Sequence, residues 1–331
     1  MLHLVMDGLC SYLIFAKLYP DNTEFSLFIF LGYNLLAFVT QAPVGAIIDK
    51  YNKPKLFLVI SCICISLGYI LSGVAIISVI LIGMGNSLFH VCGGKYITEE
   101  SDNDISALGI FVSTGAIGLF IGQKYASFLP LVFIFFSVLL IGTVLLFLSN
   151  DGKRTENREV SVEIKNSFAI FIAVIAVVVI RSFIGKIATG EFEITGIVAL
   201  LIALATALGK ACGGIVSKII GINKAAIISF TVAAVCLTLG RGVAVIYIIG
   251  VFAFNFSMPI TLYFANQLLN GKEGFAFGSL AAFLIPGYFI AMSIPKEAAI
   301  YTVIPLVIMS LALILITGCA FNTEKGQENT K

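Results

Sequence analysis

Charged residues are scarce in this sequence, and tryptophan is absent. Only 11% of the 331 residues carry charge, whereas a soluble domain carries about 25%. No basic run is interleaved with aromatic residues, which excludes a nucleic-acid-binding protein. Because 59% of the residues are hydrophobic, the chain has too few polar residues to cover the surface of a water-soluble protein. We therefore expect its solvent to be the lipid bilayer, with any interfacial aromatic belt made by Tyr and Phe.

Signatures of catalysis and of metal binding are missing as well. The chain has no phosphate-cradling Walker loop, no HExxH and no GxSxG, so we expect neither ATP drive nor an enzyme, and no cofactor. All seven cysteines fall inside apolar segments, and Cys62 and Cys64 face different sides of a helix. We predict no metal site from them. Apolar sequence begins at Leu2 without a basic region before it, which predicts a retained first helix.

Hydrophobic segments of about 20 residues, the length that spans a membrane, recur along the whole chain. Twelve of them can be counted, and because several joints are very short, ten or eleven spans remain alternatives. The segments are 2–19, 26–48, 56–74, 77–97, 106–123, 127–149, 167–188, 194–216, 224–240, 242–266, 275–294 and 300–320. The sequence predicts an all-α membrane protein.

A polar stretch divides these segments into two sets of six. We predict an N-terminal six-helix bundle over 1–149, a solvated linker over 150–166, a C-terminal bundle over 167–321 and a polar tail over 322–331. The linker carries charges of both signs and no apolar core, and the tail composition is typical of disorder.

The distribution of Lys and Arg in the short loops predicts the orientation. The linker's side holds thirteen of them, at Lys50, Lys53, Lys55, Lys95, Lys153, Arg154, Arg158, Lys165, Lys218, Lys224, Lys272, Lys325 and Lys331. The opposite side holds five, at Lys17, Lys124, Lys186, Arg241 and Lys296. We therefore expect a multi-pass protein of the cytoplasmic membrane with both termini in the cytoplasm.

The two halves repeat each other weakly. The pattern Gly-x-x-x-Asp-Lys, which ends at Lys50, returns after the eighth span as Gly-x-x-x-Ser-Lys, which ends at Lys218. Asn86 and Asn255 are separated by nearly the same interval, and Ala107-Leu108-Gly109 and Ala276-Phe277-Gly278 share the interval of the two asparagines. We call the interval from Asn86 to Asn255 the repeat spacing. The sequence thus predicts a duplicated six-span unit, and two parallel repeats around a central site are a recurring plan of transporters.

The segment GAIIDKYNKPK, from Gly45 to Lys55, resembles the loop 2–3 signature of the major facilitator superfamily. The resemblance implies two pseudo-symmetric six-helix bundles, and a conformational latch formed by Gly45, Asp49 and Lys50. HLVMD, from His3 to Asp7, and GMGNSLFH, from Gly83 to His90, are similar to the fosmidomycin-resistance-like drug-efflux branch. In this superfamily the first and fourth helices both line the cavity.

Ionisable residues inside spans cost about 2.5–3.5 kcal/mol on insertion scales and need a partner or a function. The candidates are Asp7, His90, Arg181 and Lys210. Asp7 and His90 fall at about the same depth, at ~1.5 Å per residue, and we expect them to couple proton movement to substrate movement. A fixed hydrogen bond is the structural alternative for both. Arg181 is predicted as a counter-charge or anion ligand, or as a snorkelling side chain, and Lys210 as a snorkelling one.

Side-chain amides supply a candidate cavity lining. We predict that the substrate contacts four of these amides and one guanidinium, namely Asn34, Gln41, Asn86, Asn255 and Arg181. Asn34 and Gln41 are seven residues apart and would share a helix face. Amides also join helices in membranes, which is the alternative role. Pro259 and Pro286 interrupt spans ten and eleven.

Three functions are compatible with these features. The leading prediction is a monomeric, proton-coupled transporter that exports a small amphipathic solute. The second is an uptake carrier for a small organic anion, with Arg181 as its ligand. The third is an intramembrane enzyme or a non-transporting assembly protein. The scattered charges and the repeated architecture disfavour an enzyme.

Overall fold

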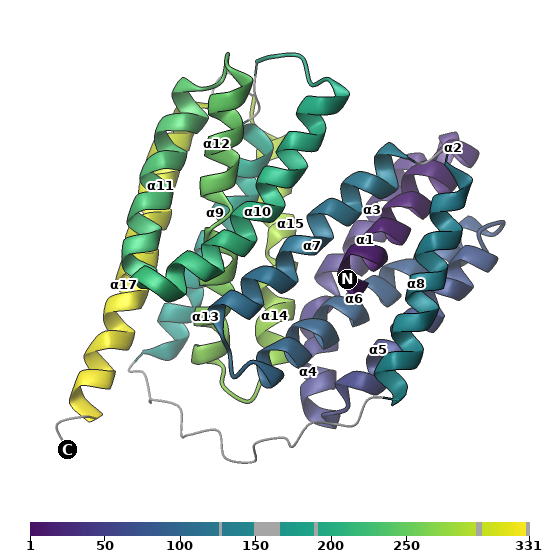
Figure 1. Ribbon diagram of the computed structural model, residues 1–331, viewed down its shortest axis with the longest axis horizontal. Coiled ribbons are helices and arrows are strands. Elements are labelled where there is room, and N and C mark those ends of the chain that lie inside the picture. The colour runs from purple at the N-terminus through teal and green to yellow at the C-terminus, as the bar shows by residue number, and fades with distance from the viewer. Residues whose placement is uncertain (126–127, 149–165, 189–190, 296–299, 329–331) are drawn as a thin grey trace. The chain divides into compact units, whose positions relative to one another are not determined.

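Helices make up every regular element that the computed structural model describes. The described residues are 1–125, 128–148, 166–188, 191–295 and 300–328, and they contain no strand. The predicted linker therefore lies almost entirely outside the described residues. Eleven helical segments of at least 18 residues are apolar enough to cross a membrane, and the apolar helix α5 (Pro54–Ile70) adds a twelfth of 17 residues. The predicted all-α class is confirmed, as the ribbon in Figure 1 shows, and the eleven long helices with the shorter α5 agree with the twelve predicted spans.

The first two spans are interrupted by π-helical turns. The first span consists of α1 (Leu2–Tyr12), η1 (Leu13–Leu18) and α2 (Tyr19–Asp21), and the second of η2 (Thr23–Phe25), α3 (Ser26–Asn34), η3 (Leu35–Val39) and α4 (Gln41–Tyr51). Spans four to six are α6 (Ala75–Glu100), α7 (Ile105–Lys124) and α8 (Leu129–Leu148).

Spans ten and eleven each break just before a proline. The spans of the second half are α9 (Ser167–Ile187), α10 (Gly196–Ile220), α11 (Ile222–Leu239), α12 with α13 (Ala244–Phe254, Ser257–Leu268), α14 with α15 (Glu273–Ala282, Leu284–Met292), and η4 with α17 (Ile300–Thr302, Val303–Glu328). Pro259 and Pro286 are the third residues of α13 and α15. Because proline lacks the N–H and its ring clashes with the preceding turn, both breaks have the cause that the sequence predicts.

The described chain separates into two compact units. One comprises Met1–Glu100, Thr114–Arg154 and Lys272–Ala282; the other comprises Ser101–Ser113, Thr155–Gly271 and Phe283–Lys331. Each unit thus takes one short segment from the other half of the sequence, namely α14 in the first and the start of α7 in the second. The predicted division at the linker remains a prediction.

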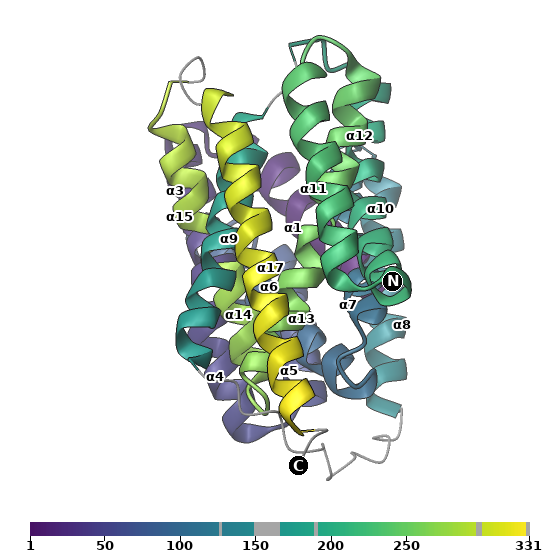
Figure 2. The same cartoon turned by 90° about the vertical axis from the view of Figure 1, so that its left-hand side faces the viewer.

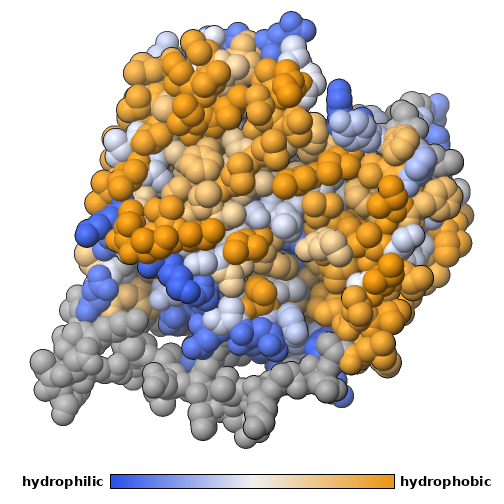
Figure 3. Space-filling view, viewed as in Figure 1, coloured by the Kyte–Doolittle hydropathy of each residue, from blue (hydrophilic) through white to orange (hydrophobic). Residues whose placement is uncertain are grey.

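In the first unit α5 packs along α6, and α14 packs against α4. In the second unit α11 lies beside α12 and α17, and α15 beside α9; Figures 1 and 2 both show α11 next to α17. Large apolar side chains remain exposed on helices of both units, among them Phe133 and Leu145 on α8, Ile219 on α10 and Val245 on α12. In Figure 3 hydrophobic residues cover most of the visible face, and hydrophilic ones gather along its lower part and at its upper edge. A hydrophobic band of this kind is what a membrane protein requires.

Close helix contacts recur at the repeat spacing. In the first unit a side chain added at Gly45 would overlap the carbonyl of Gly274. In the second unit one added at Gly214 would overlap the carbonyl of Ile105. Gly214 follows Gly45 at the repeat spacing, and Gly274 follows Ile105 at the same spacing. This doubled contact supports the duplication that the sequence predicts.

A second contact pair has the same relation. Gly278 packs on the carbonyl of Gln41, and Gly109 packs on the carbonyl of Lys210. The repeat spacing separates the two glycines from each other, and it also separates Lys210 from Gln41. The two helix crossings are therefore equivalent contacts in the two units, each made close by a glycine.

Candidate ion-coupling site

Asp7, on α1, contacts both histidines of the chain. Its Oδ2 is 3.2 Å from His3 Nε2, and its Oδ1 is 3.3 Å from His90 Nε2 on α6. The two Nε2 atoms are themselves 3.0 Å apart. The structure thus brings Asp7 and His90 together, as the comparison of their depths predicts, and adds His3. We call these three side chains the His–Asp–His cluster.

The distances within the cluster constrain its hydrogens. His90 Nδ1 lies 2.9 Å from the carbonyl of Asn86, and because a carbonyl only accepts, Nδ1 carries a hydrogen. A neutral His90 therefore turns the lone pair of its Nε2 toward both His3 and Asp7. A hydrogen on His3 Nε2 can satisfy the contact between the histidines, but the Asp7 oxygen 3.3 Å away still faces a lone pair. A further proton or another cation relieves this repulsion, so the cluster favours a bound positive charge.

The cluster is enclosed by three helices. Asp7 and His3 are buried, and His90 is the most accessible member, with 15% of its side chain exposed. On α7, a Cβ added at Gly115 would lie 2.6 Å from His3 Nε2 and would overlap Asp7. Gly115 therefore leaves the space that the cluster occupies.

His3 is the functional candidate that sequence reasoning missed. It lies within the resemblance segment HLVMD, but only Asp7 was singled out there. The i, i+4 spacing of His3 and Asp7 on one helix face was the available signal, and Cys10 extends this face at i+7. Asn86 Nδ2 lies 3.4 Å from both Asp7 Oδ1 and Cys10 Sγ. Asn86 thus belongs to the surroundings of the cluster.

The second span does not keep the spacing assumed for Asn34 and Gln41. The π-helical turn η3 lies between them, so the α-helical period no longer places both on one face. Asn34 Nδ2 donates to its own helix at Phe30 O, 2.7 Å away, and Gln41 Nε2 donates to Ala37 O at 2.6 Å. Gln41 is fully buried. Substrate binding by either amide remains a prediction.

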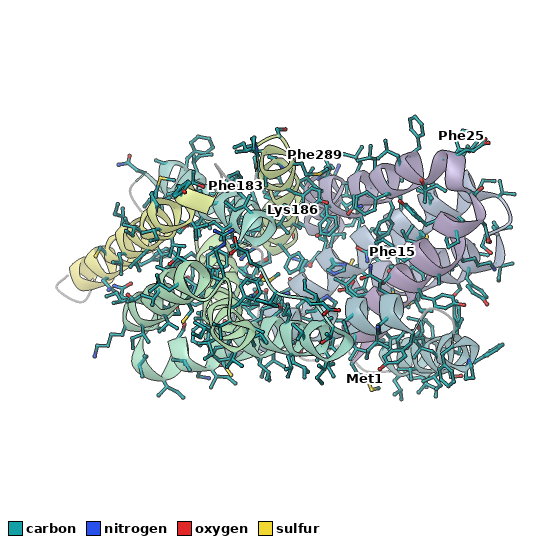
Figure 4. The ribbon with its side chains drawn as sticks, turned by 90° about the horizontal axis from the view of Figure 1, so that it is seen from above. Met1, Phe15, Phe25, Phe183, Lys186 and Phe289 are labelled. Carbon is teal, nitrogen blue, oxygen red and sulfur yellow. The ribbon has the colours of Figure 1, made fainter. Side chains whose placement is uncertain are left out.

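Arg181 and Asn255 belong to the second unit, whereas the cluster belongs to the first. Arg181 Nη1 lies 3.4 Å from the Thr261 hydroxyl, and Asn255 Nδ2 donates to Val251 O in its own helix at 2.8 Å. Further along α9, Lys186 Nζ lies 5.1 Å from the ring centroid of Tyr288 on α15. Figure 4 shows Phe183, Lys186 and Phe289 together on these two helices.

Asp49 caps the start of α14. Its Oδ1 accepts from the Gly274 N–H at 2.9 Å and its Oδ2 from the Phe275 N–H at 2.8 Å. These N–H groups have no partner within the helix, and the helix dipole favours a negative charge there. Gly45, one turn earlier, permits the close approach of α4 to α14. Both residues therefore occupy positions suited to the latch that the resemblance implies.

Lys95 completes this contact. Its Nζ lies 3.2 Å from Asp49, 2.8 Å from Glu99 and 3.3 Å from Glu273. The loop assignment of Lys95 was wrong, because α6 runs on to Glu100 and leaves the Lys95 side chain only 3% exposed. We call Asp49, Lys95, Glu99 and Glu273 the buried charge network.

Lys50 lies outside the network. Its side chain is exposed, and its Nζ lies 5.9 Å from the ring centroid of the neighbouring Tyr51. Nothing in the described contacts joins Lys50 to α14, so its predicted latch role has no contact to support it.

A smaller version of the network occurs in the second unit. Asp104 precedes α7, accepts from the Ser106 N–H at 2.7 Å and pairs with Lys218 at the end of α10. Partial burial acts to raise the pKa of Asp104, but the hydrogen bonds from Lys218 and from the first turn of α7 outweigh it and lower that pKa. Asp104 precedes Glu273 at the repeat spacing, so acids at equivalent positions begin both helices.

Comparisons with solved structures identify the fold of the chain. No protein-family model and no curated protein matches the chain. Among solved structures, a variant of the E. coli fucose:proton symporter FucP matches with a TM-score of 0.66 at 10% identity over 98% of this chain and 97% of that one. The chain has the major facilitator fold.

Two further structures agree. FucP in the outward conformation gives a TM-score of 0.62 at 11% identity, over 96% of this chain and 98% of that one. A bacterial homologue of the iron transporter ferroportin, in an outward-facing state, gives 0.57 at 14% identity, with 98% of each chain covered. All three comparisons cover nearly complete chains. The twelve-span prediction and the major facilitator fold thus describe the same architecture.

Proposed function

We propose that the chain is a secondary active transporter that moves a small solute across the cytoplasmic membrane by alternating access. The His–Asp–His cluster is the observation that carries this proposal, because buried ionisable groups that are costly in a membrane have a function by default. The major facilitator fold and the doubled helix contacts agree with it. The named structural neighbours are transporters, and we assign the chain no enzymatic activity.

Protons are the coupling ion in this proposal, with Asp7 and His90 as the groups that exchange them. His3 joins this pair, since its Nε2 is 3.0 Å from that of His90 and the cluster favours a positive charge. Gain or loss of a proton here changes the net charge of the cluster, and this change is the coupling step that we propose. The fucose:proton symporter among the fold neighbours is an example of proton coupling in this fold.

The finer assignments follow from the sequence. We propose efflux by antiport, in the manner of the fosmidomycin-resistance-like branch, by a monomer with both termini in the cytoplasm. In this scheme the buried charge network holds one conformation closed. Asp49 supplies the cap of α14, Gly45 its close approach, and Lys95 the counter-charge.

A second candidate is uptake of a small organic anion. Arg181 favours it, because a guanidinium in a span can bind a carboxylate through two hydrogen bonds, and its described hydrogen bond goes to a neutral hydroxyl. A non-transporting assembly protein is the remaining alternative. It would tolerate the loss of Asp7, whereas a carrier would not.

The test is a resistance and uptake screen in a transporter-deficient host, with and without a proton uncoupler. We expect the wild-type chain to change the tolerance or content of at least one solute, in an uncoupler-sensitive way. Asp7→Asn and His90→Ala should reduce this to the level of the empty host. Asp21→Asn is the matched control, since Asp21 is an exposed carboxylate at the far end of the same span. Full uncoupler-sensitive activity in both cluster variants would refute the coupling role.

A further inference from the structure

The His–Asp–His cluster brings both histidines of the chain to one carboxylate. The sequence contains two histidines in all, and both meet Asp7 although they lie 87 residues apart. Each of the three residues offers one ligand atom, and these three atoms all lie within 4.8 Å of one another. Histidine can join membrane helices by hydrogen bonds, but a buried carboxylate held by two histidines inside a span is costly and has a function by default.

We propose that His3, Asp7 and His90 bind a divalent transition-metal ion and that this ion is the transported cargo. The cargo half rests on the transport function proposed above, whereas the binding half stands on the geometry alone. Sequence reasoning assigned no metal site because it examined cysteine spacing and catalytic motifs. The ligands here come from two helices that only the fold brings together.

The spacing of the donor atoms suits an ion. The Nε2 atoms are 3.0 Å apart, and Asp7 oxygens lie 3.2 and 3.3 Å from them. An ion about 2.1 Å from each donor, the usual metal–nitrogen and metal–oxygen distance, would subtend angles of about 90–105° with such spacings. The two distances to Asp7 involve different oxygens, Oδ2 for His3 and Oδ1 for His90, so these angles apply to a carboxylate that binds through both oxygens. Two histidines and one carboxylate form a ligand set typical of divalent transition metals.

Neighbouring groups orient the ligands as they do around bound metals. A metal-ligating histidine donates its other ring N–H to a carbonyl, carboxylate or water, which fixes the tautomer. His90 Nδ1 has this partner in the carbonyl of Asn86, so its Nε2 lone pair faces the cluster. The Asn86 amide approaches Asp7 Oδ1 at 3.4 Å from the other side. Both contacts hold the donors in place.

The ligand set is also suited to release. Three protein ligands leave coordination positions for water, as in sites where an ion exchanges or reacts. A dedicated storage site would close its shell. His90 is the most accessible of the three, so we expect the ion to enter and leave beside it. Imidazole nitrogens suit Zn²⁺, Fe²⁺, Co²⁺ and Ni²⁺, whereas Mg²⁺ and Ca²⁺ take oxygen ligands.

Isothermal titration of the purified full-length chain with Zn²⁺ tests the binding half. The affinity tag must contain no histidine. We expect one Zn²⁺ per chain, displaced by Co²⁺ but not by excess Mg²⁺ or Ca²⁺. His3→Ala and His90→Ala should each weaken binding by about 100-fold or more, since even outer-shell substitutions cost about 10–100-fold.

Matched variants separate a metal site from a structural contact. Asp21→Asn and Cys64→Ser remove a carboxylate and a thiol elsewhere in the same unit and should leave the affinity unchanged. His90→Cys replaces one ligand by another that Zn²⁺ accepts and should restore binding that His90→Ala loses. Unchanged stoichiometry and affinity in the His3→Ala, His90→Ala double variant would overturn the proposal.

Transport of Zn²⁺ into proteoliposomes that contain a metal-sensitive dye tests the cargo half. We expect Zn²⁺ flux that is lost in His90→Ala and kept in Cys64→Ser. Binding without flux would refute the ion as cargo while leaving the binding site. Uncoupler-sensitive activity on an organic solute, with no Zn²⁺ binding, would instead refute the metal site and keep the proposed transport function.

Discussion

Gly115 shows how much a single residue decides in this molecule. A side chain there would enter the space between His3 and Asp7, so the cluster exists because position 115 has no Cβ. The residue itself carries no chemistry. Its value lies in letting α7 close one side of a site whose ligands come from α1 and α6.

Replacing this glycine therefore tests the packing of the cluster. Gly115→Ala should displace His3 or Asp7, destabilise the protein by about 1–3 kcal/mol, the usual cost of overpacking, and abolish transport. Gly185→Ala is the matched control, since its Cβ would meet open space and alanine favours the helix. Thermal unfolding in detergent and flux measure the two effects. Equal behaviour of the two variants would contradict the assigned packing.

Residue-level predictions from the sequence succeeded where they required only the depth of a residue along its membrane-spanning helix. Asp7 and His90 meet because helix length sets their height. Asn34 and Gln41 depended on an unbroken α-helical period, which the π-helical turn η3 interrupts. His3 sits near the start of the chain, where a sequence does not reveal how deeply the helix is buried. Lys95 lies two residues before the end of the predicted segment 77–97 and was counted with the loop that follows, whereas α6 runs on to Glu100.

At the scale of elements, the contact of α4 with α14 joins a helix end to a buried charge. Asp49 serves two partners at once, the first N–H groups of α14 and the ammonium of Lys95. Glu273 and Glu99 share the same ammonium. Sequence resemblance predicted Asp49 as part of a latch but not these partners, since they come from helices remote in the chain.

Removing the Asp49 charge should therefore weaken this helix pair. In Asp49→Asn the amide oxygen can still accept one N–H, but Lys95 loses a counter-charge. Removal of one partner from a buried pair costs about 3–5 kcal/mol, and the two further acids should hold the loss to the low end of this range. Glu100→Gln, at an exposed carboxylate on the same helix as Lys95, should be neutral. An unchanged unfolding temperature in Asp49→Asn would remove the network from the account.

At the scale of the whole molecule, duplication explains why similar contacts occur twice. The fold class and the number of spans were predictable because hydrophobic length alone sets them. The sequence did not predict which segment joins which unit, because this depends on close contacts at helix crossings. Gly45 with Gly274 and Gly214 with Ile105 are examples. The two copies have since diverged. The first holds the His–Asp–His cluster, whereas the second places Arg181 near Thr261.

The most direct test of the account is whether water reaches the cluster from both sides of the membrane in turn. The measurement is labelling of His90→Cys, in a chain whose seven native cysteines are replaced by serine, with a charged, impermeant thiol reagent. Right-side-out and inside-out vesicles present the two faces. We expect labelling from both faces, since each conformation opens to one of them. Labelling from one face alone, or from neither, would contradict alternating access at this site.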